Sequence, residues 1–449
     1  MSKFLFLSSC CRAILQSNPV FGHYQYIGKK FTSKSIFQAR QYVQVSSSAV
    51  VSESTKKPST ASSQVRSVPL RESSLEETRQ SWREFLQSIV NSPEGVGYLA
   101  GASLRVGFFT MMSLLALRIV DDMNQLRNSR KRSISPELGR LIVNMLKECL
   151  VACRQDYDNI RRGYYKLPAF PTRRWSSILP STFNYLLDLR MVQSRRLGNR
   201  YKELPQQLDG DYPDYYKRNF HYQTDGYLSD YSAKLYEYQV EVLFNGVADT
   251  MRRQALVPLF EYVQTHSIKQ MKLLHVACGT GGILSDLVEN YPQLRIVNLD
   301  LSPYYLREAR KRHDSYRNAY LRFVCGKAEK LDFGDNSFDV LLNIYLFHEL
   351  PPDIREKAAT EFFRVLKPGG MLIFVDSIQE NDRSDLNRLL QMFPQLYHEP
   401  YYPSYIKMDL KKLFESVGFQ YSNRYISWVT KVCVFYKPFQ KVSHDVGQT

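Results

Sequence analysis

A glycine-rich turn near the middle of the chain is the first group of residues that could do chemistry. An apolar run, 271–276, leads into Ala277-Cys-Gly-Thr-Gly-Gly282, and 283–288 carries apolar residues at helical spacing. In a strand, turn and helix of this kind, glycines let the backbone approach a ligand closely, and the helix start presents unpaired N–H groups. Asp300 ends the next apolar run, 19 residues after Gly281. A carboxylate at that distance suits ribose hydroxyls, so the pattern predicts a nucleotide site.

The elements that must position this site alternate between strands and helices. Further strands are expected at 321–324, 338–343 and 371–375, with helices over 304–314, 354–366 and 410–417. Two β-rich runs close the pattern at 421–428 and 431–436, near enough to form an antiparallel pair. This alternation predicts an α/β fold around a mostly parallel sheet.

Several ordered motifs connect the chain to one family. They are ACGTG at 277–281, Asp300, GKAEKLDFGDNSFD at 326–339 and EFFRVLKPGGMLIF at 361–374. With them, the chain resembles class I S-adenosylmethionine (SAM)-dependent methyltransferases, in particular the ubiquinone and menaquinone methyltransferase-like group, methyltransferase type 11. A less characterised branch from cyanobacteria and plants shares further motifs at 219–230, 346–350, 376–378 and 398–402. The resemblance implies a Rossmann-like, seven-stranded class I methyltransferase sheet over 211–440, with its core at 265–437 and an N-terminal helical region before it.

SAM is the cofactor that this resemblance implies, and no metal is expected. It assigns the methionine part to the backbone of the glycine turn, ribose to Asp300, adenine to the residues after the second and third strands, and the sulfonium to the end of the fourth. The implied cofactor-binding residues are His275, Ala277, Cys278, Gly279, Thr280, Gly281, Asp300, Leu301, Ala328, Glu329 and Asn343. His275 stands where the family has an acid, so it either offers the cofactor a single hydrogen bond or points into the sheet and never meets it.

An acceptor that must lose a proton needs a base within hydrogen-bond reach. His348 and Asp376 follow the fourth and fifth strands and are the candidate catalytic residues, with purely structural roles as the alternative. Two further groups are left open. One is a lid or hydrogen-bond network formed by His221, Asp225, Tyr227 and Asp230. The other is an aromatic acceptor wall or ordinary aromatic cluster formed by Tyr397, His398, Tyr401 and Tyr402.

The part of the chain before the methyltransferase motifs divides by composition. Residues 1–52 contain no Asp or Glu but many Ser and several Lys and Arg, which is typical of an organellar transit peptide, although a disordered basic tail has the same composition. Residues 53–72 are expected to be a disordered linker, and 441–449 a tail. Over 73–210 we expect a helical and irregular region, with helices at 74–92 and 98–123, another starting at Pro136, and an irregular arm over 162–218.

The excess of positive over negative charge is confined to the first part of the chain. Residues 1–200 hold 30 Lys and Arg against 13 Asp and Glu, whereas 201–449 hold 30 against 31. Targeting or an acidic partner would explain this asymmetry. Arg127–Arg132 is either a solvated loop or a contact with an anionic membrane or nucleic acid, and nucleic acid is the less favoured because no RNA-binding signature accompanies it. No membrane-spanning helix is expected, because the best apolar run, 106–117, is flanked by arginines.

The expected function is methyl transfer from SAM to a small lipophilic or aromatic molecule, such as a quinone-like compound or a lipid. An RNA or protein methyltransferase that uses the basic N-terminal half is one alternative, although Asn343-Ile-Tyr-Leu346 replaces the Asn/Asp-Pro-Pro-Tyr signature of many amino-group methyltransferases. A non-catalytic SAM-binding assembly protein is another. The transit-peptide composition indicates an organelle, and the cyanobacterial likeness favours a plastid over a mitochondrion.

Overall fold

The computed structural model describes residues 91–128, 136–168, 172–208, 210–316 and 320–439, together with 84, 85, 87 and 89. The expected transit peptide at 1–52, the linker at 53–72 and the tail at 441–449 lie outside these residues. So does most of the helix expected over 74–92.

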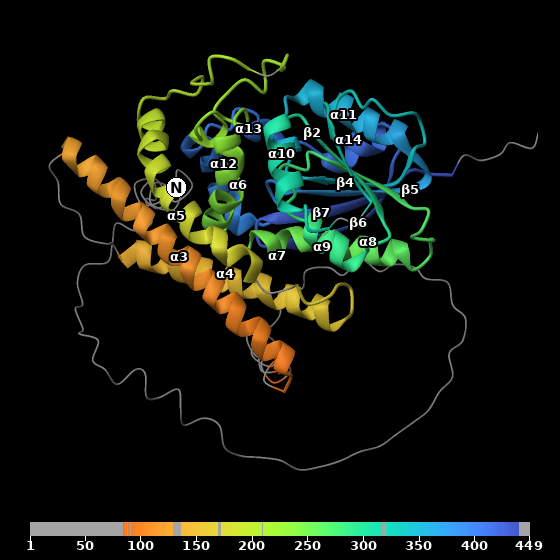
Figure 1. The fold of residues 1–449 in the computed structure, drawn as a ribbon, viewed down its shortest axis with the longest axis horizontal. Helices are drawn as coiled ribbons and strands as arrows, with labels where there is room; N and C mark the ends of the chain where they lie inside the picture. Colours follow the sequence, from red (N-terminus) through yellow and green to blue (C-terminus); the bar gives the residue numbers. More distant parts are fainter. Residues whose placement is uncertain are drawn as a thin grey trace, which may run out of the picture. The chain divides into compact units, whose positions relative to one another are not determined.

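A seven-stranded sheet forms the centre of the fold, in the order β3-β2-β1-β4-β5-β7-β6 (Figure 1). β7 is antiparallel to both β5 and β6, while the other pairs are parallel. This is the class I methyltransferase arrangement, so the α/β prediction is confirmed. The strands are β1 (Lys272–Val276), β2 (Arg295–Asp300), β3 (Leu321–Cys325), β4 (Phe338–Ile344), β5 (Leu366–Ser377), β6 (Gln420–Ser427) and β7 (Thr430–Tyr436).

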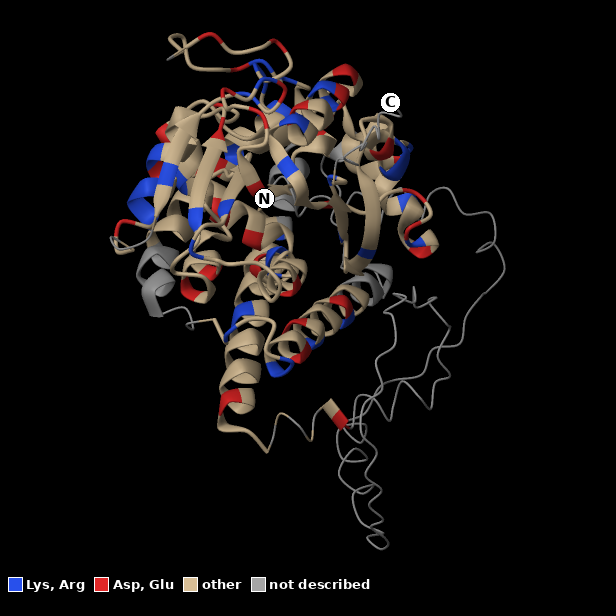
Figure 2. Ribbon diagram, turned by 90° about the vertical axis from the view of Figure 1, so that its right-hand side faces the viewer, with Lys and Arg blue, Asp and Glu red and all other residues tan. Residues whose placement is uncertain are grey.

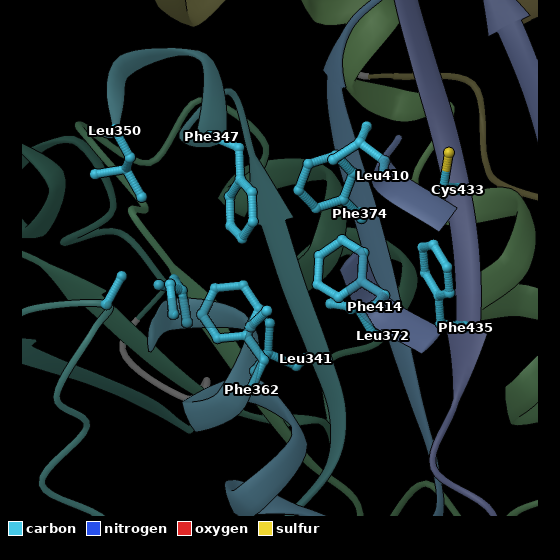
Figure 3. Close-up of a cluster of buried hydrophobic side chains, with 14 of the residues drawn as sticks. Leu341, Phe347, Leu350, Phe362, Leu372, Phe374, Leu410, Phe414, Cys433 and Phe435 are labelled. Atoms are coloured by element: carbon cyan, nitrogen blue, oxygen red, sulfur yellow. The ribbon is translucent and has the colours of Figure 1, made fainter. Parts of the chain in front are cut away.

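Helices cover both faces of the sheet, because strands buried on both sides must be shielded twice. α11 and α14 pack on one face through an aromatic cluster that includes Phe362, Phe374, Phe414 and Phe435 (Figure 3). α8 and α9 pack on the other face around aliphatic side chains (Figure 1). The helices here are α8 (Leu256–Val263), α9 (Leu284–Asn290), α10 (Pro303–Arg312), α11 (Pro352–Val365), α12 (Asn387–Leu396), α13 (Tyr402–Tyr405) and α14 (Leu410–Ser416), with short turns η5 (Phe347–Glu349) and η6 (Ser384–Leu386).

Three long helices precede the sheet: α3 (Pro93–Asn128), α4 (Pro136–Arg161) and α5 (Thr172–Leu197). α4 begins at the expected proline. α3 begins earlier than expected, because Pro93 opens the helix and Ser92 Oγ accepts a hydrogen bond from the Gly95 N–H. The irregular arm expected over 162–218 is wrong for its central part, where α5 runs for 26 residues. Its inner face shows helical spacing, with Tyr185, Leu189 and Val192 buried.

These helices pack on α6 (Asp230–Leu243) and α7 (Ala248–Arg253), which connect them to the sheet (Figure 1). α3 and α5 share one cluster with α6, built on Phe109 and Tyr238 among others. A buried ion pair joins α4 to α7, because both oxygens of Asp156 accept hydrogen bonds from the Arg253 guanidinium, at 3.0 and 2.7 Å. The helical layer is therefore anchored by apolar contacts and by buried charge.

The apolar character of α3 exceeds the sequence expectation. Pro93–Ala116 is long and apolar enough to cross a membrane by length and composition, although only 28% of its most apolar window is buried in the protein. Arg105 had seemed to interrupt this segment. It turns inward instead, and its Nη2 lies 2.6 Å from Glu241 Oε1 and 2.9 Å from Asp249 Oδ2. α3 is therefore packed on the rest of the protein along one side, and is not an isolated membrane-spanning helix.

Candidate active site

The glycine turn and Asp300 meet at the carboxyl ends of β1 and β2. Gly279 adopts a positive φ of 57° and donates its N–H to Asp300 Oδ2 at 2.7 Å. The Ser302 N–H is donated to Asp300 Oδ1 at 2.8 Å. Burial raises the pKa of the Asp300 carboxyl to about 6, and hydrogen bonds from the backbone of Ser302, Gly279 and Leu301 oppose this shift. The carboxylate thus connects the turn to the second strand and remains charged at neutral pH.

A cavity opens directly over this pair of elements. Six predicted cofactor-binding residues line it: Ala277, Gly279, Asp300, Leu301, Ala328 and Glu329. A Cβ placed on Gly279 would meet only Tyr236 Cε1, at 3.9 Å, so a side chain there would project into the cavity. The glycine therefore leaves space that a ligand can fill.

Cys278, Thr280, Gly281 and Asn343 are not among the residues that line the cavity, although the sequence assigned them to it. Gly281 is required for packing, since a Cβ there would lie 2.8 Å from His313 Cε1. The Thr280 hydroxyl donates a hydrogen bond to Glu237 Oε1 at 2.7 Å. Asn343 connects the carboxyl ends of β4 and β1 through a hydrogen bond from its Nδ2 to the Val276 carbonyl at 3.1 Å. Thr280, Gly281 and Asn343 therefore fix the shape of the turn through contacts outside the cavity.

His275 lies on the opposite face of the sheet from the aromatic cluster. Successive strand side chains alternate, and Leu273, two residues earlier, belongs to the core beneath α8 and α9. Burial lowers the pKa of His275 to about 4, with Arg252 reinforcing the shift and Asn298 opposing it. His275 does not line the cavity, and it is neutral at physiological pH.

A carboxylate does reach the glycine turn, and it comes from α6. Glu237 accepts hydrogen bonds from Thr280 and, at 2.8 Å, from Arg252 Nη1. Burial disfavours its charged form, but Arg252 and Arg312 outweigh burial and lower the pKa of Glu237 to about 2. The turn is thus supported by a permanently charged network.

Glu329 provides a test of whether a nucleoside fits the cavity. Its Oε1 accepts a hydrogen bond from the Tyr215 hydroxyl at 2.7 Å. Its Oε2 is buried and has no hydrogen-bond partner among the described residues. A buried acceptor without a partner is costly unless a ligand supplies a donor. Because Glu329 lines the cavity, the amino group of an adenine suits this oxygen, and the residues present fit SAM.

Aromatic side chains form the roof of the cavity. Tyr215, Tyr216, Phe220 and Tyr227 come from the segment before α6, and Tyr236 comes from α6 itself. The sequence had suggested Tyr227 as part of a lid, but the other four were missed. Their signal was the density of tyrosines over 212–236, which the sequence alone could not orient toward the cofactor turn.

His348 and Asp376 form a buried pair, with His348 Nδ1 2.6 Å from Asp376 Oδ1. Burial disfavours the imidazolium, but the Asp376 carboxylate outweighs burial and raises the pKa of His348 to about 9. The Asp376 oxygens also accept hydrogen bonds from the backbone N–H groups of Phe347 and Ser377. Neither side chain lines the cavity. A histidine already protonated at neutral pH is poorly suited to be the general base that the sequence suggested.

Glu349, which the sequence did not single out, is the acidic group next to this pair. It lines the cavity, and the Tyr227 hydroxyl donates a hydrogen bond to its Oε1. His348 Nε2 lies 3.8 Å from the same oxygen, and His221 Nε2 lies 3.7 Å from it. The signal available in the sequence was its position next to His348, at the end of a strand in an open α/β sheet.

His221 connects Glu349 to a second buried carboxylate, since its Nδ1 lies 2.9 Å from Glu399 Oε1. These three residues are grouped closely enough to hold a metal ion. However, each imidazole nitrogen faces a different carboxylate, which is the geometry of a histidine bridging two acids. The predicted lid or network at His221 is thus, in the structure, a buried polar network. Asp230 instead forms an exposed ion pair with Arg307.

The aromatic segment before the last helix is packed into the core. Tyr397 is fully buried, and Tyr402 is nearly so, with its hydroxyl 2.7 Å from Ser377 Oγ. His398 stacks on Tyr201 with ring centroids 4.1 Å apart. None of the four residues proposed as an acceptor wall lines the cavity. The ordinary aromatic cluster is the interpretation that the structure supports.

Known proteins resemble this region of the chain. The family model described as "Methyltransferase domain" matches residues 273–370. The chain is 31% identical over 153 residues to a fatty-acid O-methyltransferase of Mycolicibacterium smegmatis, covering 33% of this chain and 54% of that protein. It is 40% identical over 105 residues to a phthiotriol/phenolphthiotriol dimycocerosates methyltransferase of Mycobacterium leprae (23% and 37%). It is 28% identical over 154 residues to a demethylmenaquinone methyltransferase of Lactococcus lactis (32% and 60%).

The chain contains a class I SAM-dependent methyltransferase domain. SAM is the methyl donor of this domain, as the sequence motifs implied. The chain spans less than two thirds of the length of each of these relatives. The matched methyltransferase region contains the turn, Asp300 and Glu329, whereas the whole aromatic roof lies before it.

Proposed function

We propose that this protein transfers a methyl group from SAM to a small lipophilic or aromatic acceptor, of the lipid or quinone kind. The observation that carries the proposal is the cavity, whose floor bears carboxylates suited to a nucleoside and whose roof is aromatic. The relatives named for fatty-acid, phthiotriol and demethylmenaquinone methylation support this class of acceptor.

When bound, SAM supplies a methyl group on a positively charged sulfonium. The chain itself provides positioning. Asp300 accepts hydrogen bonds from ribose hydroxyls, Glu329 Oε2 accepts one from the adenine amino group, and the tyrosine roof excludes water. Aromatic ring faces also favour a neighbouring cation. Positioning of two reactants in this way contributes roughly 7–11 kcal/mol to lowering a barrier.

Glu349 is the proposed base for an acceptor that carries a hydroxyl. Its carboxylate would take the hydroxyl proton of the acceptor, and SAM, when bound, would supply the methyl group that the acceptor oxygen receives. Tyr227 and the protonated His348 act as positioning residues, because they contact Glu349 and do not need to exchange a proton themselves.

The proposal is tested by incubating the purified protein with methyl-labelled SAM and lipid or quinone extracts of organelles. Label transferred to an extractable lipophilic product is the expected result. Transfer only to RNA or protein would contradict the acceptor class. SAM binding without transfer to any of these would favour a non-catalytic role.

We also propose an organellar location, with a plastid favoured over a mitochondrion. The acid-free, Ser-rich composition of residues 1–52 supports it. Residues 1–60 fused to a fluorescent reporter should direct it to that organelle in plant cells, and a diffuse cytosolic signal would contradict the proposal.

A further inference from the structure

The three long N-terminal helices expose an unusual amount of apolar surface. Fifteen large hydrophobic side chains are exposed in the part of the chain that the structure describes, and twelve of them lie on α3, α4 and α5. Large exposed apolar patches mark interaction sites. The twelve are Val96, Leu104, Met111, Leu114, Leu115, Val143, Leu150, Val151, Phe183, Leu187, Met191 and Leu197.

On each helix, these residues occupy one face. On α3, exposed positions recur from Val96 through Leu104 and Met111 to Leu115 at helical spacing, and no charged side chain occurs among them. On α5, Phe183, Leu187 and Met191 are four residues apart. The opposite faces are buried in clusters that include residues of α6 and Val247, the residue before α7. The exposed faces therefore point away from the sheet domain, and Figure 2 shows a long uncharged stretch in the N-terminal part of α3.

Each apolar face also carries one exposed base. Arg118 continues the α3 face, Lys147 lies between Val143 and Leu150 on α4, and Arg190 lies beside Met191 on α5. No exposed acid lies on these three faces within the described residues. Long basic side chains can lay their apolar stems along hydrocarbon and keep their charge in the headgroup region.

We propose that this outer face of α3, α4 and α5 docks onto an anionic lipid surface, lying in the interface without crossing it. Apolar side chains beside scattered bases are the composition of an interfacial element. The exposed bases on these faces, with no exposed acid among them in the described residues, complement an anionic membrane, whereas the same bases on a second copy of this chain would repel them. The packing of α3 on α4, α5 and α6 keeps its inner side in the protein. The inference does not depend on methyl transfer.

Flotation with lipid vesicles tests the proposal on the full chain at physiological salt. Wild type should float with phosphatidylcholine vesicles that contain phosphatidylglycerol. The double variants Leu104→Ser/Met111→Ser and Phe183→Ser/Met191→Ser should each lose on the order of tenfold in apparent affinity, since each removes two apolar anchors. Tyr320→Ser, an exposed apolar residue next to β3, is the matched control and should float like wild type. All variants should keep the wild-type melting temperature, because every substituted residue is exposed.

A direct readout separates face docking from attraction by the basic N-terminal extension. The emission of Leu104→Trp should gain a component that brominated lipids quench, relative to wild type, whereas Tyr320→Trp should not. Face variants that float like wild type, or a Leu104→Trp emission that brominated lipids leave unquenched, would overturn the proposal. So would a wild-type oligomer, seen by light scattering, that the face variants convert to monomers, because a second copy would then cover the face.

Discussion

Asp300 joins the glycine turn to β2 through its two carboxylate oxygens, and its raised pKa gives the site a pH limit. In the proposed role as an acceptor for the ribose hydroxyls, Asp300 acts in its charged form. The SAM dissociation constant should therefore be flat above about pH 7 and weaken about tenfold per unit below a pH of about 6. Calorimetry across this range measures it. His275→Asn should show the same profile, because His275 is already neutral, and a flat profile down to about pH 5 would contradict this role.

The raised pKa of Asp300 gives the stability of the cofactor-free protein the opposite pH dependence. The folded pKa of Asp300 lies above its value in an unfolded chain, so the folded state binds the proton more tightly. Its contribution to stability is therefore present at low pH and is lost as pH rises through about 6. Other groups titrate in this range as well, so the SAM dissociation constant is the cleaner measurement.

Two glycines of one turn should respond differently to an added methyl group. Gly279→Ala places a methyl in the cavity, so SAM affinity should fall about tenfold or more, while the positive φ costs only about 1–2 kcal/mol of stability. Gly281→Ala forces a methyl against His313 and should add overpacking of about 1–3 kcal/mol to the same backbone strain. Urea unfolding and calorimetry on both variants separate the effects. Equal SAM affinity in Gly279→Ala and wild type would mean that this turn does not face the cofactor.

The proposed base can be distinguished from its neighbours by kinetics. Glu349→Gln should lower kcat by roughly 10²–10⁴-fold, the range for loss of a general base, with SAM affinity nearly unchanged. Glu349→Asp should recover part of the rate. Tyr227→Phe removes a hydrogen bond to Glu349 and should cause a smaller loss, with a shifted pH profile. A Glu349→Gln variant with wild-type kcat would leave Glu349 as a structural carboxylate.

At the scale of elements, Asp156 is the main charged link between α4 and the sheet domain. It accepts hydrogen bonds from Arg253, Tyr98 and Tyr165, and its side chain is fully buried. Asp156→Asn should lower the free energy of unfolding by about 3–5 kcal/mol, because Arg253 would be left as a buried charge with its main partner neutralised. Asp158→Asn, on the same helix but part-exposed, should cost about 0–1 kcal/mol. Similar costs in urea unfolding would contradict this assignment.

The strands followed from the sequence because each strand is a short apolar run next to a turn signal, and their assembly into one seven-stranded sheet was implied by the family resemblance. The turn and Asp300 were predictable because strand ends meet at one edge of the sheet, whereas Glu329 was named only through the family resemblance. α5 was missed because its Tyr and Arg residues and Pro180 obscured the helical spacing of Tyr185, Leu189 and Val192. The protonation of His348 was unpredictable, because it depends on a carboxylate 28 residues away in sequence.

At the scale of the whole molecule, the N-terminal helices and the methyltransferase sheet share buried charges. Arg105 of α3 neutralises Glu241 of α6 and Asp249 of α7. Burial raises the pKa of Glu241, and Arg105 opposes that shift. The boundary expected near residue 211 therefore does not separate two independent charge distributions.

These ion pairs continue as far as the cofactor turn. Asp249 Oδ1 lies 3.2 Å from Arg252 Nη1, which lies 2.8 Å from Glu237 Oε2, and Glu237 Oε1 accepts the Thr280 hydrogen bond. A displacement of α3 would therefore be transmitted to Thr280 through three successive ion pairs. Such a connection makes allosteric coupling between the outer helical face and the cofactor site physically available.

Thermodynamic reciprocity then sets a quantitative expectation. If vesicles change SAM affinity by some factor, SAM must change vesicle affinity by the same factor. We expect a factor of about 5 or more, at the lower end of measured couplings, and Arg105→Met should bring it close to one while both ligands still bind. Calorimetry of SAM binding with and without anionic vesicles measures one side, and flotation with and without SAM measures the other. If vesicles raise SAM affinity, this protein would hold its cofactor most tightly where a membrane-dissolved acceptor of the proposed kind is within reach.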